Sequence, residues 1–161
     1  MPEERVLGKN YPRVDAADKV SGRSQYAGDV HLPGMLICKV LKSGRPHARI
    51  LRIDTSQAEQ VPGVRAVITG KDIPNMRFGS GAVKDRRVFA LEKVRFVGEP
   101  LAAVAAVDEI AALEALDLIQ VTYEDLPAVT NPIDALMPEA PLVHEDLPGY
   151  DGYAAGMGGN V

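Results

Sequence analysis

The chain has 161 residues and a mass of 17.3 kDa, with 46% apolar and 25% charged residues. This is ordinary for one globular domain that folds without disulfides or a structural metal. Lysine and arginine number 18 against 22 aspartate and glutamate, which gives a net charge of −4 and a pI near 5.4. That balance argues against a nucleic-acid-binding domain and against a polybasic membrane surface.

Cysteine usage and apolar run length exclude further classes. The single cysteine, Cys38, rules out an internal disulfide framework and any all-cysteine zinc or iron–sulfur site within this chain. No apolar run approaches the length of a membrane span, and the N-terminal residues lack the apolar core of a secretory signal. We therefore expect a soluble, cytoplasmic protein.

The first half of the chain predicts an arm and then three strands. Residues 1–15 are polar and predict an extended arm. The apolar run 35–41 follows a Pro-Gly turn signal and predicts a strand. In 48–54 arginine alternates with aliphatic residues, which favours a strand with one exposed face. A short helical turn then leads to a third strand at 64–69.

Residues 70–87 form the least regular stretch and predict a long surface loop. The loop contains Arg77, Lys84, Arg86 and Arg87. Loops of this length in a compact domain are usually functional or mobile. Its positive charge would suit an anionic part of a substrate or a partner surface, but the same charge is also typical of a solvated loop. Both interpretations stay open.

The second half predicts two strands, a helix and a further strand. After strands at 93–97 and 101–107, Asp108 is the expected cap of the best helix in the chain. A strand at 120–123 follows, so strand, helix and strand predict a βαβ-like unit within a mixed sheet. The expected apolar face of the helix consists of Ile110, Leu113, Leu116 and Ile119.

The C-terminal segment is rich in proline and then in glycine. Prolines between 127 and 148 leave room only for a short helical turn near 133–137. Residues 149–161 predict a glycine-rich linker towards a missing domain. Within it, 156–160 superficially resembles a phosphate loop, but such a loop must follow a strand and open a helix. The linker interpretation is therefore preferred.

No residue pattern predicts a self-sufficient active site. His31, His47 and His144 lie in separate segments without metal-ligand spacing, and the nearest cluster, 144–146, is a run of adjacent residues that point to opposite faces. Cys38 lies in an apolar strand, where cysteine is usually an inert small hydrophobe. Glu99 is either a functional carboxylate or a turn residue. We therefore predict no catalytic, cofactor-binding or metal-binding residue in this chain.

Several segments in order nevertheless resemble a known family. They are residues 12–22, 26–30, 32–36, 47–50, 53–56, 62–67, 94–104 (VRFVGEPLAAV) and 121–129 (VTYEDLPAV). Together they resemble the α/β hammerhead domain of the molybdopterin-binding large subunit in the xanthine dehydrogenase and aldehyde oxidase family, which includes carbon monoxide dehydrogenase and 4-hydroxybenzoyl-CoA reductase. The resemblance implies an α+β fold in which a mixed β-sheet packs with one main helix and short helices. The hammerhead domain would span residues 1–148, including the arm.

The resemblance also implies a complete enzyme with molybdenum on a molybdopterin, [2Fe–2S] clusters and often FAD. This chain would contact a molybdopterin-binding domain or subunit, an iron–sulfur subunit and, where present, an FAD subunit. Its pterin-binding and catalytic motifs would lie downstream of the hammerhead. The loop before residue 88 would line the substrate funnel, with Met76, Arg77, Phe78, Arg86 and Arg87 as its site residues.

Two other classes compete with this interpretation. One is a stand-alone interaction module that has the fold without the chemistry, and the other is a small independent enzyme that uses His47 or Glu99. The sequence does not indicate the substrate, or whether the reaction is an oxidation or a reductive dehydroxylation. It also leaves open whether Val161 is a natural terminus, and the oligomeric state.

Overall fold

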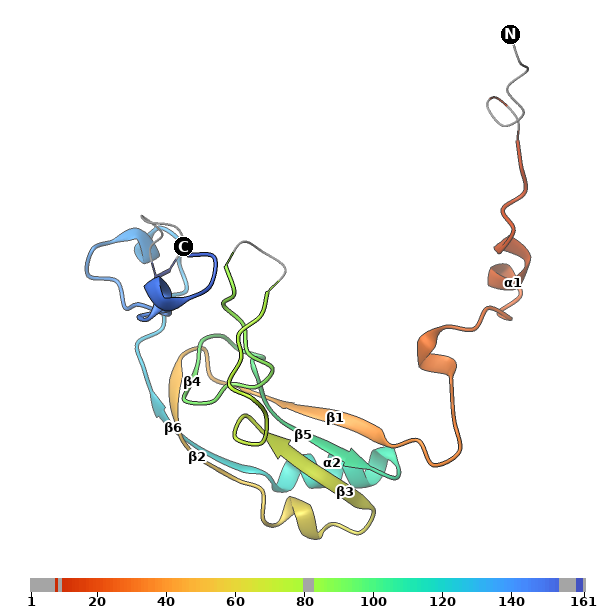
Figure 1. Ribbon diagram of the computed structural model, residues 1–161, viewed down its shortest axis with the longest axis horizontal. Coiled ribbons are helices and arrows are strands. Elements are labelled where there is room, and N and C mark those ends of the chain that lie inside the picture. The colour runs from red at the N-terminus through yellow and green to blue at the C-terminus, as the bar shows by residue number, and fades with distance from the viewer. Residues whose placement is uncertain (1–7, 9, 80–82, 154–158, 161) are drawn as a thin grey trace. The chain divides into compact units, whose positions relative to one another are not determined.

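The computed structural model of the chain describes residues 8, 10–79, 83–153 and 159–160. The chain forms two compact units, Met1–Met35 and Leu36–Val161. The first unit has a short helix, α1 (Ala16–Val20), and a 3-10 turn at Ala27–Asp29. No residue of α1 is buried. All six strands found among the described residues, and the long helix, lie in the second unit (Figure 1).

The strands of the second unit form two three-stranded sheets. In the first, the strand order is β1 (Ile37–Lys42), β5 (Pro100–Ala106) and β3 (Val64–Thr69). In the second, it is β4 (Lys93–Val94), β2 (Ala48–Asp54) and β6 (Gln120–Asp125). The expected strands are therefore present, although the strand expected at 93–97 pairs only over its first two residues. Short 3-10 turns lie at Ala58–Gln60, Asp134–Leu136 and Leu147–Gly149.

The α+β fold is confirmed, but the arrangement of its strands differs from the expected βαβ unit in a mixed sheet. Every strand pairing in the described part of the chain is antiparallel. Strands β5 and β6, which the helix joins, belong to different sheets. Both edges of β5 are already occupied by β1 and β3, so β6 pairs with β2 instead. There the opposed residues Arg49 and Glu124 form an ion pair of 2.7 Å.

Helix α2 (Glu109–Leu118) packs on the sheet β1-β5-β3 through alanines rather than through its large residues. Ala111, Ala112 and Ala115 are buried. Ile110 is 78% exposed and Leu113 is 46% exposed, so the predicted apolar face was wrong at both positions. Alanine is small enough to let the helix backbone approach the sheet closely, and this outweighs the burial of larger side chains. Of the expected residues, Leu116 packs partly against the core and Ile119 is 8% exposed.

The N-terminus of α2 is fixed by two contacts. The Asp108 carboxylate Oδ1 accepts a hydrogen bond from the Ala111 amide at 2.8 Å, which confirms the predicted cap. The turn before β3 also lies against this end, because the Val107 amide donates to the Gly63 carbonyl at 2.9 Å. Gly63 has a φ of +96°, and a Cβ there would lie 2.9 Å from Val107 Cγ2. Only glycine fits this turn.

A second apolar cluster lies beneath the turn between β4 and β5. Its buried members are Ala48, Ala90, Val94 and Leu101. Val94 and Leu101 flank the tight turn that connects β4 to β5, in which Gly98 has a φ of +93°. The Gly98 amide donates to the Ser43 carbonyl at 2.7 Å, and the Ser43 amide donates to the Glu99 carbonyl at 2.9 Å. The turn is thereby held against the end of β1.

Part of the expected C-terminal linker packs back on the preceding segment. Tyr150 is buried, and the Gly159 carbonyl accepts a hydrogen bond from the His144 amide at 3.1 Å. The Asn160 side chain bonds to the Val143 amide and to the Pro141 carbonyl, at 2.8 and 3.0 Å. Residues 154–158 and 161, which include most of the stretch that resembles a phosphate loop, lie outside the described residues. The linker stays a prediction.

Candidate functional site

The cationic loop at 70–87 is partly organised by backbone pairing. Phe78 and Arg86 exchange two backbone hydrogen bonds, of 2.9 and 3.0 Å, and form an isolated antiparallel bridge. Met76 is 66% exposed and Phe78 is 45% exposed. The loop therefore presents two large apolar side chains to its surroundings, beside its arginines.

The arginines of the loop differ in what they contact. Arg77 forms an ion pair of 2.5 Å with Asp146, and its guanidinium carbon lies 3.5 Å from the centre of the Tyr150 ring. Arg87 donates a hydrogen bond to the Asn75 side chain. The Arg86 side chain is exposed and has no hydrogen bond or ion pair with any residue that the structure describes. Arg77 thus ties the loop to the C-terminal segment, whereas no described residue holds the Arg86 side chain.

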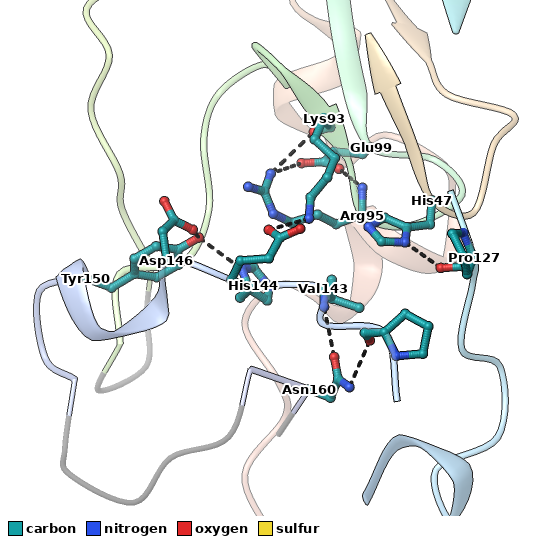
Figure 2. A network of polar contacts seen from close by, with 12 residues as sticks. His47, Lys93, Arg95, Glu99, Pro127, Val143, His144, Asp146, Tyr150 and Asn160 are labelled. Carbon is teal, nitrogen blue, oxygen red and sulfur yellow. Dashed lines mark hydrogen bonds and ion pairs between the residues drawn. The ribbon is translucent and has the colours of Figure 1, made fainter. Parts of the chain in front are cut away.

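A charged cluster that the sequence did not predict lies beside this loop (Figure 2). We call it the Arg95 cluster, and it consists of Lys93, Arg95, Glu99, His144 and Glu145. Lys93 is 9% exposed, and its Nζ pairs with Glu145 Oε2 at 2.6 Å. This ion pair joins the start of β4 to the segment after residue 143. Segments about fifty residues apart therefore meet at one place.

Arg95 and Glu99 lie at the two ends of the β4–β5 turn. The Glu99 carboxylate is buried, and its Oε2 accepts a hydrogen bond from the Arg95 backbone amide at 2.6 Å. The Arg95 guanidinium Nη1 lies 3.9 Å from Glu99 Oε1 and donates to the Lys93 carbonyl at 3.3 Å. Arg95 Nε is buried and has no hydrogen-bond partner among the described residues. The guanidinium is therefore poorly satisfied for a side chain that is only 14% exposed.

Burial and charge shift the pKa values around the cluster. Burial raises the pKa of Glu99 above its ordinary value and outweighs the opposing hydrogen bond from the Arg95 amide and the nearby positive charges. Burial, with the Arg95 charge, lowers the pKa of His144, so its imidazole is neutral at pH 7. Burial also acts on Asp146, but hydrogen bonds from Arg77 and Tyr150 outweigh it and lower its pKa to about 2.

Two adjoining cavities open at this cluster. One has a volume of about 420 Å³, which is within the range of small-molecule sites. The other, of about 260 Å³, shares Asp85, Val143 and His144 with it. The lining of the larger cavity comprises Asp85, Arg86, Arg87, Arg95, Phe96, Glu99, Pro100, Val143 and His144. Its basic groups and apolar wall can bind an anion that has an apolar part.

Among the five expected funnel residues, Arg86 and Arg87 line this cavity. Arg77 and Arg87 line another hollow with Tyr150, whereas Met76 and Phe78 line no described cavity. Sequence reasoning missed Lys93 and Arg95. The available signal was a basic and an acidic residue four positions apart across the tight turn at Gly98, between two apolar strands.

The remaining candidate residues, His47, Cys38 and His31, line neither of these two cavities. His47 is 5% exposed, and its Nδ1 contacts the Pro127 carbonyl at 2.7 Å, as expected of an imidazole that donates from this atom. Cys38 lies in a strand as expected, but it is exposed, because β1 alternates and turns this residue to its outer side. His31 lies in the other unit. Within residues 10–79, 83–153 and 159–160, no helix is long and apolar enough to span a membrane.

Comparison with known proteins identifies the fold. The family model described as "Aldehyde oxidase and xanthine dehydrogenase, a/b hammerhead domain" matches residues 21–127. A probable xanthine dehydrogenase subunit of Bacillus subtilis is 46% identical over 135 residues, which cover 83% of this chain and 18% of that protein. The carbon monoxide dehydrogenase large chain of Afipia carboxidovorans is 40% identical over 144 residues, 88% of this chain and 18% of that protein.

Solved structures agree with this result. The crystal structure of a Cu,Mo-CO dehydrogenase in its carbon monoxide reduced state superimposes with a TM-score of 0.80 and 40% identity. The match covers 87% of this chain and 18% of the other. The architecture is thus that of an α/β hammerhead domain. The chain belongs to the aldehyde oxidase and xanthine dehydrogenase family, and it spans 18% of the length of these relatives.

Enzymes of this family are molybdenum enzymes, so metal ligands in this chain bear on its role. The described residues contain no group of three or more His, Cys, Asp or Glu that could hold a metal ion. The Arg95 cluster mixes two cations with its carboxylates, and Cys38 stands alone on β1. These residues do not fit such a centre.

Proposed function

We propose that this chain is the hammerhead part of a molybdenum-dependent oxidoreductase and is inactive alone. The observation that carries the proposal is the family match over residues 21–127 in a chain that spans only 18% of its relatives. Those relatives include a xanthine dehydrogenase subunit and a carbon monoxide dehydrogenase chain, and one solved CO dehydrogenase is a copper and molybdenum enzyme. The complete enzyme would supply molybdenum on a molybdopterin, [2Fe–2S] clusters and, where present, FAD.

The partners follow from the same proposal. The chain would pack against a molybdopterin-binding domain or subunit, with an iron–sulfur subunit and in some enzymes an FAD subunit in the same complex. Large exposed apolar residues on several elements support an interface of this kind, among them Ile110 on α2 and Phe96 and Val97 on the β4–β5 turn. A cytoplasmic location belongs to the proposal and is favoured by the single cysteine.

Within the complex, the loop that contains Met76, Arg77, Phe78, Arg86 and Arg87 would line the substrate funnel. The exposure of Met76 and Phe78 supports this role, as does the exposed Arg86 side chain, which has no ion pair or hydrogen bond with a described residue. Its test is a kinetic comparison in the assembled enzyme. Arg86→Gln should raise KM for an acidic substrate with little change in kcat, whereas Arg65→Gln, a change on the exposed face of β3, should alter neither. An unchanged KM in the Arg86 variant would contradict the proposal that this loop lines the funnel.

The proposal as a whole is tested on the protein from its source cells. We expect the native chain to be far larger than 17.3 kDa, or to co-purify with larger subunits, and its preparation to contain molybdenum and iron. Denaturing gels, mass spectrometry and metal analysis measure this. A chain that is isolated alone at 17.3 kDa without either metal would favour the second candidate, a stand-alone interaction module with the same fold. The observation behind this second candidate is that the described residues contain no group of metal ligands.

A further inference from the structure

We propose that the cavity of about 420 Å³ beside Arg95 binds a small organic carboxylate, whose oxygens pair with the guanidinium groups of Arg95 and Arg86. An apolar body of about the size of a benzene ring would lie against Phe96. The inference does not depend on the proposed function, because it concerns binding to this chain and is measured without turnover.

The first argument is the unsatisfied guanidinium of Arg95. The group has five N–H donors, yet among the described residues its side chain makes a single hydrogen bond, from Nη1 to the Lys93 carbonyl at 3.3 Å. Its Nε is buried without a partner. Leaving a buried charged donor unpaired is costly, and a bidentate carboxylate is the acceptor that best matches the geometry of a guanidinium.

Glu99 does not satisfy this demand. Its Oε2 is bonded to the Arg95 backbone amide at 2.6 Å, and its Oε1 is 3.9 Å from Nη1, beyond hydrogen-bond distance. Glu145 is likewise engaged, because it pairs with Lys93 at 2.6 Å. Neither carboxylate next to Arg95 therefore forms a hydrogen bond with its guanidinium in the described residues, and an anion in the cavity would bind the Nη groups, because Nε is buried.

The lining of the cavity selects the class of anion. Three arginines line it, Arg86, Arg87 and Arg95, against the two carboxylates of Asp85 and Glu99. Arg86 is exposed and has no side-chain partner among the residues described, so it can turn to the ligand. Phe96, Pro100 and Val143 supply an apolar wall. A carboxylate with a compact apolar body meets both sets of groups, whereas a small inorganic anion meets only the first.

The experiment measures binding of benzoate to the full chain, with any subunits that co-purify, by calorimetry and by the shift of the thermal unfolding midpoint. Benzyl alcohol, which has the same ring without the charge, and inorganic phosphate, which has charge without the ring, are the comparison probes. We expect benzoate to bind and to raise the midpoint, and the other two probes to bind more weakly.

The variants locate the site. Arg95→Met should weaken benzoate binding by about tenfold or more, since it removes a charge-assisted hydrogen bond. Arg86→Gln should weaken it by a smaller factor, and Arg65→Gln on the distant β3 strand should leave it unchanged. Because Arg86 contributes only backbone hydrogen bonds to the described fold, its variant remains informative if Arg95→Met does not fold.

Several results would overturn the inference. These are no measurable binding of benzoate, equal binding by the wild type and the Arg95→Met and Arg86→Gln variants, or phosphate that binds more tightly than benzoate. Equal binding of benzyl alcohol would also overturn it, because the apolar wall alone would then account for the affinity.

Discussion

The interface of α2 with the sheet β1-β5-β3 and the Arg95 cluster are built on opposite principles. The helix interface is made of small buried residues, with alanines on both the helix and β5, and it contains no titratable group among its buried members. The Arg95 cluster is made of partly buried charges, and one of its guanidinium nitrogens has no partner within the described chain. Both belong to the same compact unit.

The difference shows where stability and function reside. Close packing of small residues leaves no room for a ligand and makes the helix interface sensitive to the volume of each side chain. Partly buried charges with too few hydrogen bonds lower stability but leave interactions free for another molecule. We therefore expect volume changes to damage the first region and pH changes to affect the second.

The largest effect should come from Leu101, which is 1% exposed and packs in the apolar cluster beneath the β4–β5 turn. Leu101→Ala should lower the free energy of unfolding by about 2–5 kcal/mol, because it removes buried contacts and leaves a cavity. Chemical denaturation measures this. Leu136→Ala, at a position that is 69% exposed, is the matched control and should change stability by less than about 0.5 kcal/mol. Equal losses of stability in the two variants would mean that the apolar cluster around Leu101 does not stabilise the β4–β5 turn.

A smaller effect is expected at the helix interface. Ala112 is 0% exposed on α2, and Ala112→Leu should destabilise the fold by about 1–3 kcal/mol, since the added volume must push the helix away from β5. The neighbouring change Leu113→Ala, at 46% exposure, should cost much less. The two variants are compared by thermal unfolding. If Ala112→Leu were tolerated and Leu113→Ala were the unstable variant, the helix would bury the face that the sequence predicts, and not the alanine face.

The smallest effects should appear in the pH dependence of stability. Because the folded-state pKa of Glu99 is raised above 4.5, the folded state binds the proton more tightly, and stability falls as the pH rises through that pKa. Asp146 acts in the opposite direction. Its pKa is lowered from 3.8 to about 2, so its contribution is lost as the pH falls through that interval. Since the Asp146 side chain is 58% exposed, we expect this contribution to be below about 1 kcal/mol.

Two variants separate these contributions in denaturation curves measured from pH 2 to 8. Glu99→Gln should remove the loss of stability that the wild type shows as the pH rises above 4.5. Asp146→Asn should remove the loss below its ordinary pKa and leave the higher range unchanged. If each variant kept the full pH profile of the wild type, the charged region would not be the pH-sensitive part of the molecule.

The elements of the fold could be predicted because their signals are local. The strands at 48–54 and 64–69 have the predicted bounds, and the Asp108 cap lies at the predicted position. The helix face could not be predicted in the same way. A prediction from hydrophobic spacing places the larger Ile110 on the buried face rather than Ala111. In the structure Ala111 is buried and Ile110 is exposed, because only a small side chain lets the helix approach β5 closely.

The candidate site was predictable only in part, for a related reason. The cationic loop was visible because Arg77, Arg86 and Arg87 are close together in the chain. The Arg95 cluster was not, because Lys93 and Glu145 meet across fifty residues and a tight turn brings Glu99 back to the Arg95 amide. Such contacts depend on the path of the chain and have no local pattern.

The sequence by itself determined the family, the order and type of the elements and the capping of the main helix, because these depend on short motifs and on the side chains of neighbouring residues. Only the tertiary structure decided the division into two antiparallel sheets, the alanine face of α2 and the meeting of residues 93–99 with residues 143–146. Those features depend on side-chain volume, on which strand edges are free to pair, and on which charges burial brings together.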